Sequence, residues 1–336
     1  MRYPKFLSKN ATIGVVAPSA GTRPDDMAVF DSAVKKLTNL GYKLKFASHI
    51  FGNSDIAASC DGKSRAIEFS NLYLDPEVDF IMLLCGGELE IEMLPYLDLE
   101  RLAKEQPKFI LGSSDNTNLT YVLTTALNTA TLFGYDFMDF GYRNWDLATQ
   151  QAYEIISAKS NDLFSYDYYI KEKDYLNCLK EIDARHEKWP TSLSGNSEMF
   201  EGRIIGGTLD CLATLIGTKY DYTNAFLSEN QRDGFIWYLE SCDLDLLSQY
   251  RALWQLSQAG WLQQCQGILY GRAKNDEEKE GLDTKTMLEK MFGQMNIPVI
   301  YNCDIGHVKP SWCIINGAYA IVEYRDSKLR ISYIRN

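Results

Sequence analysis

The first third of the chain alternates short apolar runs with amphipathic segments. Almost every side chain in 12–17 is apolar, which is typical of a strand buried on both faces. In 25–40 the apolar residues recur at helical spacing, at Met27, Phe30, Val34 and Leu37. The alternation continues with strands expected over 42–47, 79–84 and 108–111, and helices over 63–74, 90–105 and 118–127. This order predicts an α/β fold with a parallel, doubly wound sheet and helices on both of its faces.

The pattern changes between about residues 160 and 200. The stretch 161-NDLFSYDYY-169 is rich in Tyr, Asp and Asn, and 189-WPTSLSGNSE-198 is polar and contains Pro and Gly. We therefore expect an N-terminal domain over 1–165, a linker over 166–198 and a C-terminal domain over 199–336. For the last of these we predict helices over 210–216 and 246–259, and strands over 203–206, 234–239, 267–270, 298–301 and 318–324. This half is therefore also mixed α/β, with its last strands antiparallel.

Three short polar segments directly follow predicted strands: 18-PSAG-21, 85-CGGE-88 and 112-GSSD-115. Parallel strands end at the same edge of a sheet, and open α/β sheets bind their ligands outside that edge. We therefore expect the three segments to converge, which favours a functional role for the serines of the third segment.

Ser114 and Asp115 stand where a strand gives way to a helix, and two interpretations are open. Either residue could simply cap the helix, since Ser and Asp are favoured at that position. Alternatively, a serine there is a nucleophile, because backbone N–H groups at the start of a helix stabilise an oxyanion. The elbow motif G-x-S-x-G is not met, because position 116 is Asn, so an ordinary α/β-hydrolase is not indicated.

Only three histidines are available as a general base. His186 lies in a charged, surface-like stretch, and His49 follows a strand and is interpreted as structural. His307, within 303-CDIGHVKPSW-312, follows a strand and is flanked by turn residues, which makes it the best candidate. Glu240 ends the apolar run 235-FIWYLE-240, where a carboxylate could orient a histidine.

Composition narrows the classes of function. The net charge of -11 and the lack of a Lys/Arg cluster argue against nucleic acid as a partner. No run approaches the roughly 18 apolar residues that span a bilayer, so no membrane partner is predicted. The N-terminal stretch has no apolar segment suited to a signal peptide, and we therefore expect a cytoplasmic protein.

Neither a cofactor nor a metal site is predicted. The eight cysteines form no C-x-x-C pair, which indicates reduced, mostly buried thiols rather than disulfides or a zinc site. The motifs H-E-x-x-H, G-x-x-x-x-G-K-[ST] and G-x-G-x-x-G are absent from the sequence.

Five ordered motifs resemble those of the LD-carboxypeptidases, serine peptidases that include the microcin C immunity proteins. The stretch 112-GSSDNT-117 is similar to the family's G-x-S-D-x-T motif, and 85-CGG-87 with 94-LPYLDLE-100 to its Gly-Gly element and L-P-Y-L-D segment. Further along, 202-GRIIGGTLDCLATLIGT-218 resembles its G-x-x-x-G-G-N-L segment. Glu240 matches its catalytic Glu, and 306-GHVKP-310 with 316-NGA-318 the motif around its catalytic His.

The resemblance implies a triad of Ser114, Glu240 and His307. Ser114 would attack an amide carbonyl, His307 would serve as general base and then general acid, and Glu240 would orient the imidazole. The backbone N–H groups of Asp115 and Gly87 would form the oxyanion hole.

The same resemblance implies a flavodoxin-like N-terminal domain and a smaller α/β C-terminal domain, with the site between them. It implies a homodimer that uses no metal or other cofactor. The bond cleaved would be an amide to a C-terminal residue, in this family the L,D bond of cytoplasmic murein tetrapeptides. Gly86, Ser113 and Asn116 would border the substrate.

Several residues depart from the family pattern near the expected pocket. Ser113 stands in place of an aromatic residue, so two serines compete as nucleophile, with motif register favouring Ser114. The other departures are Cys85, Asn116, Thr208, Asn316 and the lack of a Gly-Pro element in 133-FGYDFMDFG-141. Two alternatives therefore stay open. One is an immunity-type hydrolase of peptidyl-nucleotides, with Trp145 or Trp189 stacking on a base, and the other is a non-catalytic module that binds cell-wall peptides.

Overall fold

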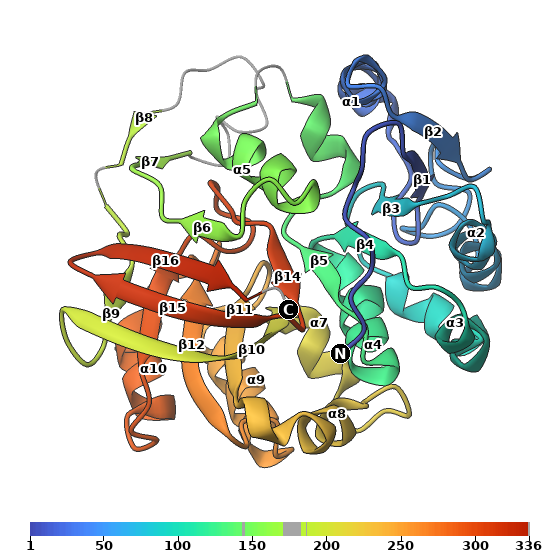
Figure 1. The fold of residues 1–336 in the computed structure, drawn as a ribbon. Coiled ribbons are helices and arrows are strands. Elements are labelled where there is room, and N and C mark those ends of the chain that lie inside the picture. Colours follow the sequence, from blue (N-terminus) through green and yellow to red (C-terminus); the bar gives the residue numbers. More distant parts are fainter. Residues whose placement is uncertain (143–144, 171–182, 186, 335–336) are drawn as a thin grey trace. The chain divides into compact units, whose positions relative to one another are not determined.

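The computed structural model of the protein describes residues 1–142, 145–170, 183–185 and 187–334, and it divides the chain into two compact units (Figure 1). The first unit comprises Met1–Lys159 together with Cys313–Ile315, and the second comprises Ser160–Trp312 and Asn316–Asn336. Each unit is built around its own sheet.

The first unit contains a six-stranded sheet in the order β14-β5-β4-β3-β1-β2. Its strands are β1 (Thr12–Val16), β2 (Lys43–Phe46), β3 (Phe80–Leu83), β4 (Phe109–Gly112), β5 (Thr131–Phe133) and β14 (Ile314–Asn316). The neighbours from β2 through β5 all pair in parallel. The order 2-1-3-4-5 is that of flavodoxin-like sheets, so the predicted fold class is confirmed.

The helices between these strands largely match the amphipathic segments of the sequence. They are η1 (Pro24–Asp26), α1 (Met27–Asn39), α2 (Gly62–Leu74), η2 (Glu90–Tyr96), α3 (Leu99–Lys104), η3 (Ser114–Asn116), α4 (Thr117–Leu127), η4 (Phe137–Gly141) and α5 (Leu147–Ile156). The expected helix over 90–105 is two pieces, because Pro95 lies in the 3₁₀ helix η2 and Asp98 caps a new helix by accepting from Arg101 N–H.

One face of this sheet carries a continuous apolar core. Helices α2, α3 and α4 pack there through residues such as Phe69, Leu102 and Leu123, which meet Ile81 of β3 and Ile110 of β4. This burial fixes the sheet, and with it the segments that leave the carboxyl ends of β1, β3 and β4.

The second unit contains an eight-stranded sheet in the order β6-β16-β15-β10-β11-β12-β13-β9. Its strands are β6 (Asp162–Phe164), β9 (Thr191–Ser192), β10 (Ser197–Thr208), β11 (Phe235–Glu240), β12 (Cys265–Gly271), β13 (Val299–Cys303), β15 (Tyr319–Arg325) and β16 (Lys328–Tyr333). The central strands β10 to β13 run parallel, while β15 and β16 pair antiparallel as expected. Its helices are α7 (Leu209–Leu215), α8 (Thr223–Glu229), η5 (Gln231–Asp233), α9 (Leu246–Gln258) and α10 (Thr284–Phe292).

The stretch that we expected to be a linker, 166–198, contains paired strands in its described part. The strand β7 (Tyr168–Tyr169) pairs with β8 (Asp183–Ala184), and β9 extends the edge of the large sheet. The second unit begins at Ser160, and it takes up about as much of the chain as the first instead of being smaller. Strands of two residues are too short for a period-two pattern, which explains why the sequence suggested a break. His186 lies outside the described residues.

A buried ionic group organises the loop that follows β13. Asp304 Oδ1 accepts from Arg272 at 2.5 Å and from Arg185 at 3.2 Å, and all three side chains are fully buried. Arg272 also donates to the carbonyls of Val308 and Pro310. These bonds fix the backbone on the C-terminal side of His307.

We predict that Asp304→Ala strongly destabilises the second unit, because it leaves two buried guanidinium groups without their carboxylate. Breaking a buried ion pair in this way costs about 3–5 kcal/mol. Thermal and urea unfolding followed by circular dichroism would measure the loss. Arg330→Gln, which removes an exposed pair with Asp162 in the same unit, should change unfolding little. Equal unfolding midpoints for the two variants would contradict this prediction.

Candidate functional site

Ser114 occupies a strained turn between β4 and α4. Its φ is 57°, in the left-handed region that non-glycine residues rarely adopt, whereas Ser113 before it is extended. Such a conformation costs on the order of 1–3 kcal/mol and persists only where the surroundings enforce it. A strained strand-to-helix turn is also how a nucleophile elbow exposes its side chain.

The surroundings of this turn are two glycines after β3. A Cβ on Gly86 would lie 2.9 Å from the Cβ and 3.1 Å from the Oγ of Ser114. A Cβ on Gly87 would lie 2.3 Å from the Oγ of Ser19, which follows β1. Any larger residue at either position would push these segments apart. The three polar segments found in the sequence therefore converge at the carboxyl edge of the first sheet.

The carboxylate of Asp115 ties the same three segments together. It accepts hydrogen bonds from the hydroxyl of Ser19, from the backbone N–H of Glu90 at 2.8 Å and from the amide of Asn118 at 2.9 Å. Within the described residues, neither η3 nor α4 has a side-chain cap at its N-terminus. Ser114 and Asp115 therefore do not act as ordinary helix caps in the structure.

Ser113 and Asn116 are held by a second buried carboxylate, that of Asp136. Ser113 donates to it through its hydroxyl at 2.6 Å and its backbone N–H at 2.9 Å, and Asn116 donates at 2.8 Å. Asn116 also donates to the carbonyl of Cys85 at 3.2 Å. These bonds give both residues a part in supporting the turn, and they distinguish Ser113 from its strained neighbour. Asp136 was not singled out from the sequence, although it lies in the atypical stretch 133-FGYDFMDFG-141.

Glu90 is a fully buried carboxyl group next to Asp115 that the sequence analysis also missed. Its Oε2 accepts from Leu119 N–H at 3.1 Å, and within the described residues its Oε1 has no hydrogen-bond partner. Burial and the nearby charge of Asp115 raise the pKa of Glu90 well above its usual range. Burial also raises the pKa of Asp115, but its three donors oppose that shift. Glu90 is therefore the member of the pair that keeps a proton.

In the second unit, Glu240 and His307 form a hydrogen-bonded pair. Glu240 is the last residue of β11 and is fully buried; its Oε2 lies 2.9 Å from Nδ1 of His307. Its Oε1 accepts from the hydroxyl of Thr208, the residue beside it in the parallel register of β10 and β11. Burial alone would raise the pKa of Glu240, but His307 and Thr208 together lower it below its usual range. The carboxylate is therefore ionised.

His307 gains its basicity from this carboxylate. Burial lowers the pKa of His307, but the charge of Glu240, together with hydrogen bonds from His307 to Glu240 and to the side chain of Cys242, more than offsets that effect and raises the pKa well above its usual value. With Nδ1–H donating to Glu240, Nε2 is the nitrogen that can take up a further proton, and 24% of the side chain is exposed. Gly306, with φ of 96°, makes the approach possible, because a Cβ there would lie 2.4 Å from Glu240 Oε2. The pair thus has the composition and geometry of a general base with its orienting acid.

Two protein-family models match this chain and show the family to which it belongs. The LD-carboxypeptidase N-terminal domain matches residues 13–134, and the LD-carboxypeptidase C-terminal domain matches residues 201–322. The chain belongs to the LD-carboxypeptidase family, and the resemblance seen in its motifs is confirmed.

Relatives in this family align along nearly the whole chain. A Bacillus subtilis protein named "Probable murein peptide carboxypeptidase" is 24% identical over 320 residues, which are 94% of this chain and 90% of that protein. The Escherichia coli microcin C7 self-immunity protein MccF is 24% identical over 338 residues, which are 97% of this chain and 94% of that protein.

Solved structures show the same two-domain fold. An MccF-like protein from Bacillus anthracis is similar with a TM-score of 0.85 and 25% identity, covering 100% of both chains. The muramoyltetrapeptide carboxypeptidase from Oxalobacter formigenes has a TM-score of 0.73 and 20% identity, covering 97% of this chain and 99% of that one. Among the described residues, no helix combines the length and apolar character needed to cross a membrane.

We predict that Glu90→Gln stabilises the protein increasingly as pH rises. Because the folded-state pKa of Glu90 is raised, its favourable protonated form is fully present below the unfolded pKa of about 4.3 and is lost as pH rises through the folded value. Glutamine keeps an acceptor for Leu119 N–H and cannot ionise. The difference in unfolding midpoint between variant and wild type should therefore grow from pH 5 to pH 8. A difference that stays constant over this range would show that Glu90 does not titrate as described.

Proposed function

We propose that this protein is a serine carboxypeptidase that hydrolyses the amide to a C-terminal residue, the L,D bond of murein tetrapeptides. The observation that carries the proposal is Ser114, held in a left-handed turn at a helix start within the family's G-x-S-D-x-T motif. The hydrogen-bonded Glu240–His307 pair, and the name of the Bacillus subtilis relative, support it.

In the proposed mechanism, Ser114 Oγ attacks the amide carbonyl while Nε2 of His307 accepts the serine proton. Glu240 stabilises the imidazolium that forms, and Thr208 holds Glu240 in place. His307 then gives the proton to the departing amine, which leaves an acyl-enzyme. A water molecule, deprotonated by His307, attacks the ester, releases the shortened peptide and restores Ser114 as a hydroxyl.

The backbone N–H groups of Asp115 and Gly87 are the proposed donors to the oxyanion. The N–H of Asp115 follows the nucleophile directly at the start of η3, where the helix dipole adds to its effect. The close packing of Gly87 against Ser19 would fix the second donor. We further propose that the protein acts in the cytoplasm, as expected of a murein-recycling enzyme, and that it forms a homodimer. In this proposal, catalysis uses no metal or other cofactor.

A second candidate function is hydrolysis of peptidyl- or aminoacyl-nucleotides. The similarity to MccF favours it. One solved structure of MccF is a complex with aspartyl sulfamoyl adenosine. Of the two tryptophans considered for base stacking, Trp145 packs against Phe140 and donates to its carbonyl, a structural role. Trp189 has Arg185 and Lys328 over its ring, at 4.8 and 5.1 Å from the centroid. Both cations would compete with a nucleobase for the face of this ring, and this favours a peptide over a nucleotide as the substrate.

We predict that Ser114→Ala lowers the rate of D-Ala release from L-Ala-γ-D-Glu-meso-diaminopimelate-D-Ala by at least about 10³-fold, since the nucleophile is lost. Ser113→Ala is the matched control and should keep activity within about tenfold, because it loses only the bond to Asp136. Glutamyl sulfamoyl adenosine is tested in parallel. Cleavage of the nucleotide alone would favour the second candidate, and cleavage of neither substrate would favour a module that only binds cell-wall peptides.

We predict that kcat/KM rises with pH through an ionisation above the usual His value of about 6.5, because His307 must be neutral to act as base. In Glu240→Gln this limb should move to lower pH, since the carboxylate that raises the pKa of His307 is gone, and the plateau should fall. The pH–rate profiles of both proteins measure this. If kcat/KM rises over the same pH range in both proteins, Glu240 does not raise the pKa of His307.

A further inference from the structure

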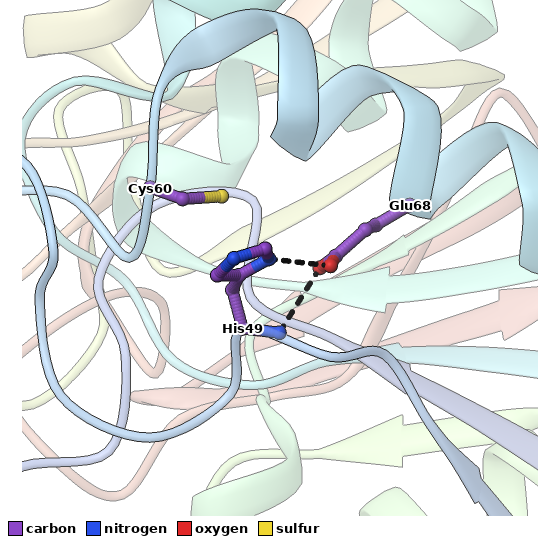
Figure 2. Close-up of side chains that lie close together, drawn as sticks. All are labelled: His49, Cys60 and Glu68. Carbon is purple, nitrogen blue, oxygen red and sulfur yellow. Dashed lines mark hydrogen bonds and ion pairs between the residues drawn. The ribbon is translucent and has the colours of Figure 1, made fainter.

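We propose that His49, Cys60 and Glu68 of the first unit form a binding site for a divalent transition-metal ion of the zinc type. Figure 2 shows the three side chains turned towards one another. His49 follows β2, Cys60 precedes α2 by two residues, and Glu68 lies within α2. Their imidazole nitrogen, thiol sulfur and carboxylate oxygen all lie within 4.8 Å of one another. The proposal is independent of the hydrolase function.

The donor set fits zinc chemistry. Zinc binds histidine nitrogen, cysteine sulfur and carboxylate oxygen, and a site with three protein ligands holds water in its fourth position. Tetrahedral bonds of about 2.0–2.3 Å place the ligand atoms about 3.5 Å apart. The three donors therefore need to approach one another by only about an ångström to bind an ion.

The site is partly organised and open to solvent. Glu68 already accepts from the His49 backbone N–H at 3.3 Å and lies 2.6 Å from the ring Nδ1 (Figure 2). An ion would take the place of the proton between Nδ1 and the carboxylate. The His49 side chain is 46% exposed and that of Glu68 13%, so an ion can enter, while Cys60 is buried beneath them.

An ordinary surface ion pair would account for His49 and Glu68 but not for the reduced thiol that faces them. The sequence did not indicate this site, because its ligands are 11 and 8 residues apart and fit no C-x-x-C or H-E-x-x-H spacing. The fold brings them together by packing the loop after β2 onto α2.

A metal bound at Cys60 would lie close to the segment after β1, which supports the turn at Ser114. Ser59, the neighbour of Cys60, donates to the carbonyls of Ala17 and Ser19, at 2.7 and 2.8 Å. Ser19 in turn donates to Asp115. We therefore assign the ion a structural role, which is to fasten this loop to α2, and not a part in the chemistry.

The test is metal binding by the whole protein, with zinc followed by calorimetry and cobalt by absorption. We expect one zinc ion per chain and a thiolate-to-cobalt charge-transfer band. In Cys60→Ser the band should vanish, and in both Cys60→Ser and His49→Gln zinc affinity should fall by about tenfold or more. Cys211→Ser, which alters a cysteine of the second unit, is the matched control and should bind like the wild type.

Thermal unfolding supplies a second readout, since an ion bound only by the folded state raises the unfolding midpoint. At the same zinc concentration, the rise in unfolding midpoint should be smaller for His49→Gln than for the wild type, because the variant binds zinc more weakly. The side chain altered in His49→Gln is exposed, so the fold should stay intact. Absence of both zinc binding and the cobalt band would overturn the proposal. So would unchanged zinc affinity in Cys60→Ser and His49→Gln.

Discussion

The close approach of three strand ends around Ser114 is the constraint on which the rest of the first unit depends. Gly86 and Gly87 let the segment after β3 pack directly against Ser114 and Ser19, where any Cβ would collide. Asp115 then joins the three segments by accepting from Ser19, Glu90 and Asn118. The strain of a left-handed serine is tolerated because these contacts enforce it. Packing and buried hydrogen bonds thus hold Ser114, the proposed nucleophile, in this turn.

Two fully buried glutamates show how their surroundings set charge. Glu240 is ionised because its interactions with His307 and with the hydroxyl of Thr208 stabilise the carboxylate and outweigh the cost of burial. Glu90 has one backbone donor and an anionic neighbour, so burial prevails and it keeps its proton. The first arrangement supports proton transfer, and the second avoids a pair of like charges beneath the proposed nucleophile.

Much of the fold could be predicted from the sequence, because the signals for strands and helices are local. Buried runs such as Phe80–Leu83 and helical stripes such as that of Met27–Asn39 predict the parallel sheet. The resemblance of five ordered motifs to those of the LD-carboxypeptidases is what implied Ser114, Glu240 and His307 as a triad. What escaped prediction depends on residues far apart in the chain. The two-residue strands β7 to β9 carry no periodicity, and Asp136, Glu90 and the His49–Cys60–Glu68 cluster gain their partners only through folding.

The central proposal is that Ser114 is the nucleophile and that His307 activates it. Labelling with a fluorophosphonate probe, located by peptide mass mapping, tests this most directly because it needs no knowledge of the substrate. We expect a single adduct on Ser114 that forms much more slowly in His307→Gln, while Arg330→Gln labels like the wild type. An adduct on Ser113, or labelling of Ser114 at the same rate in His307→Gln, would contradict the account.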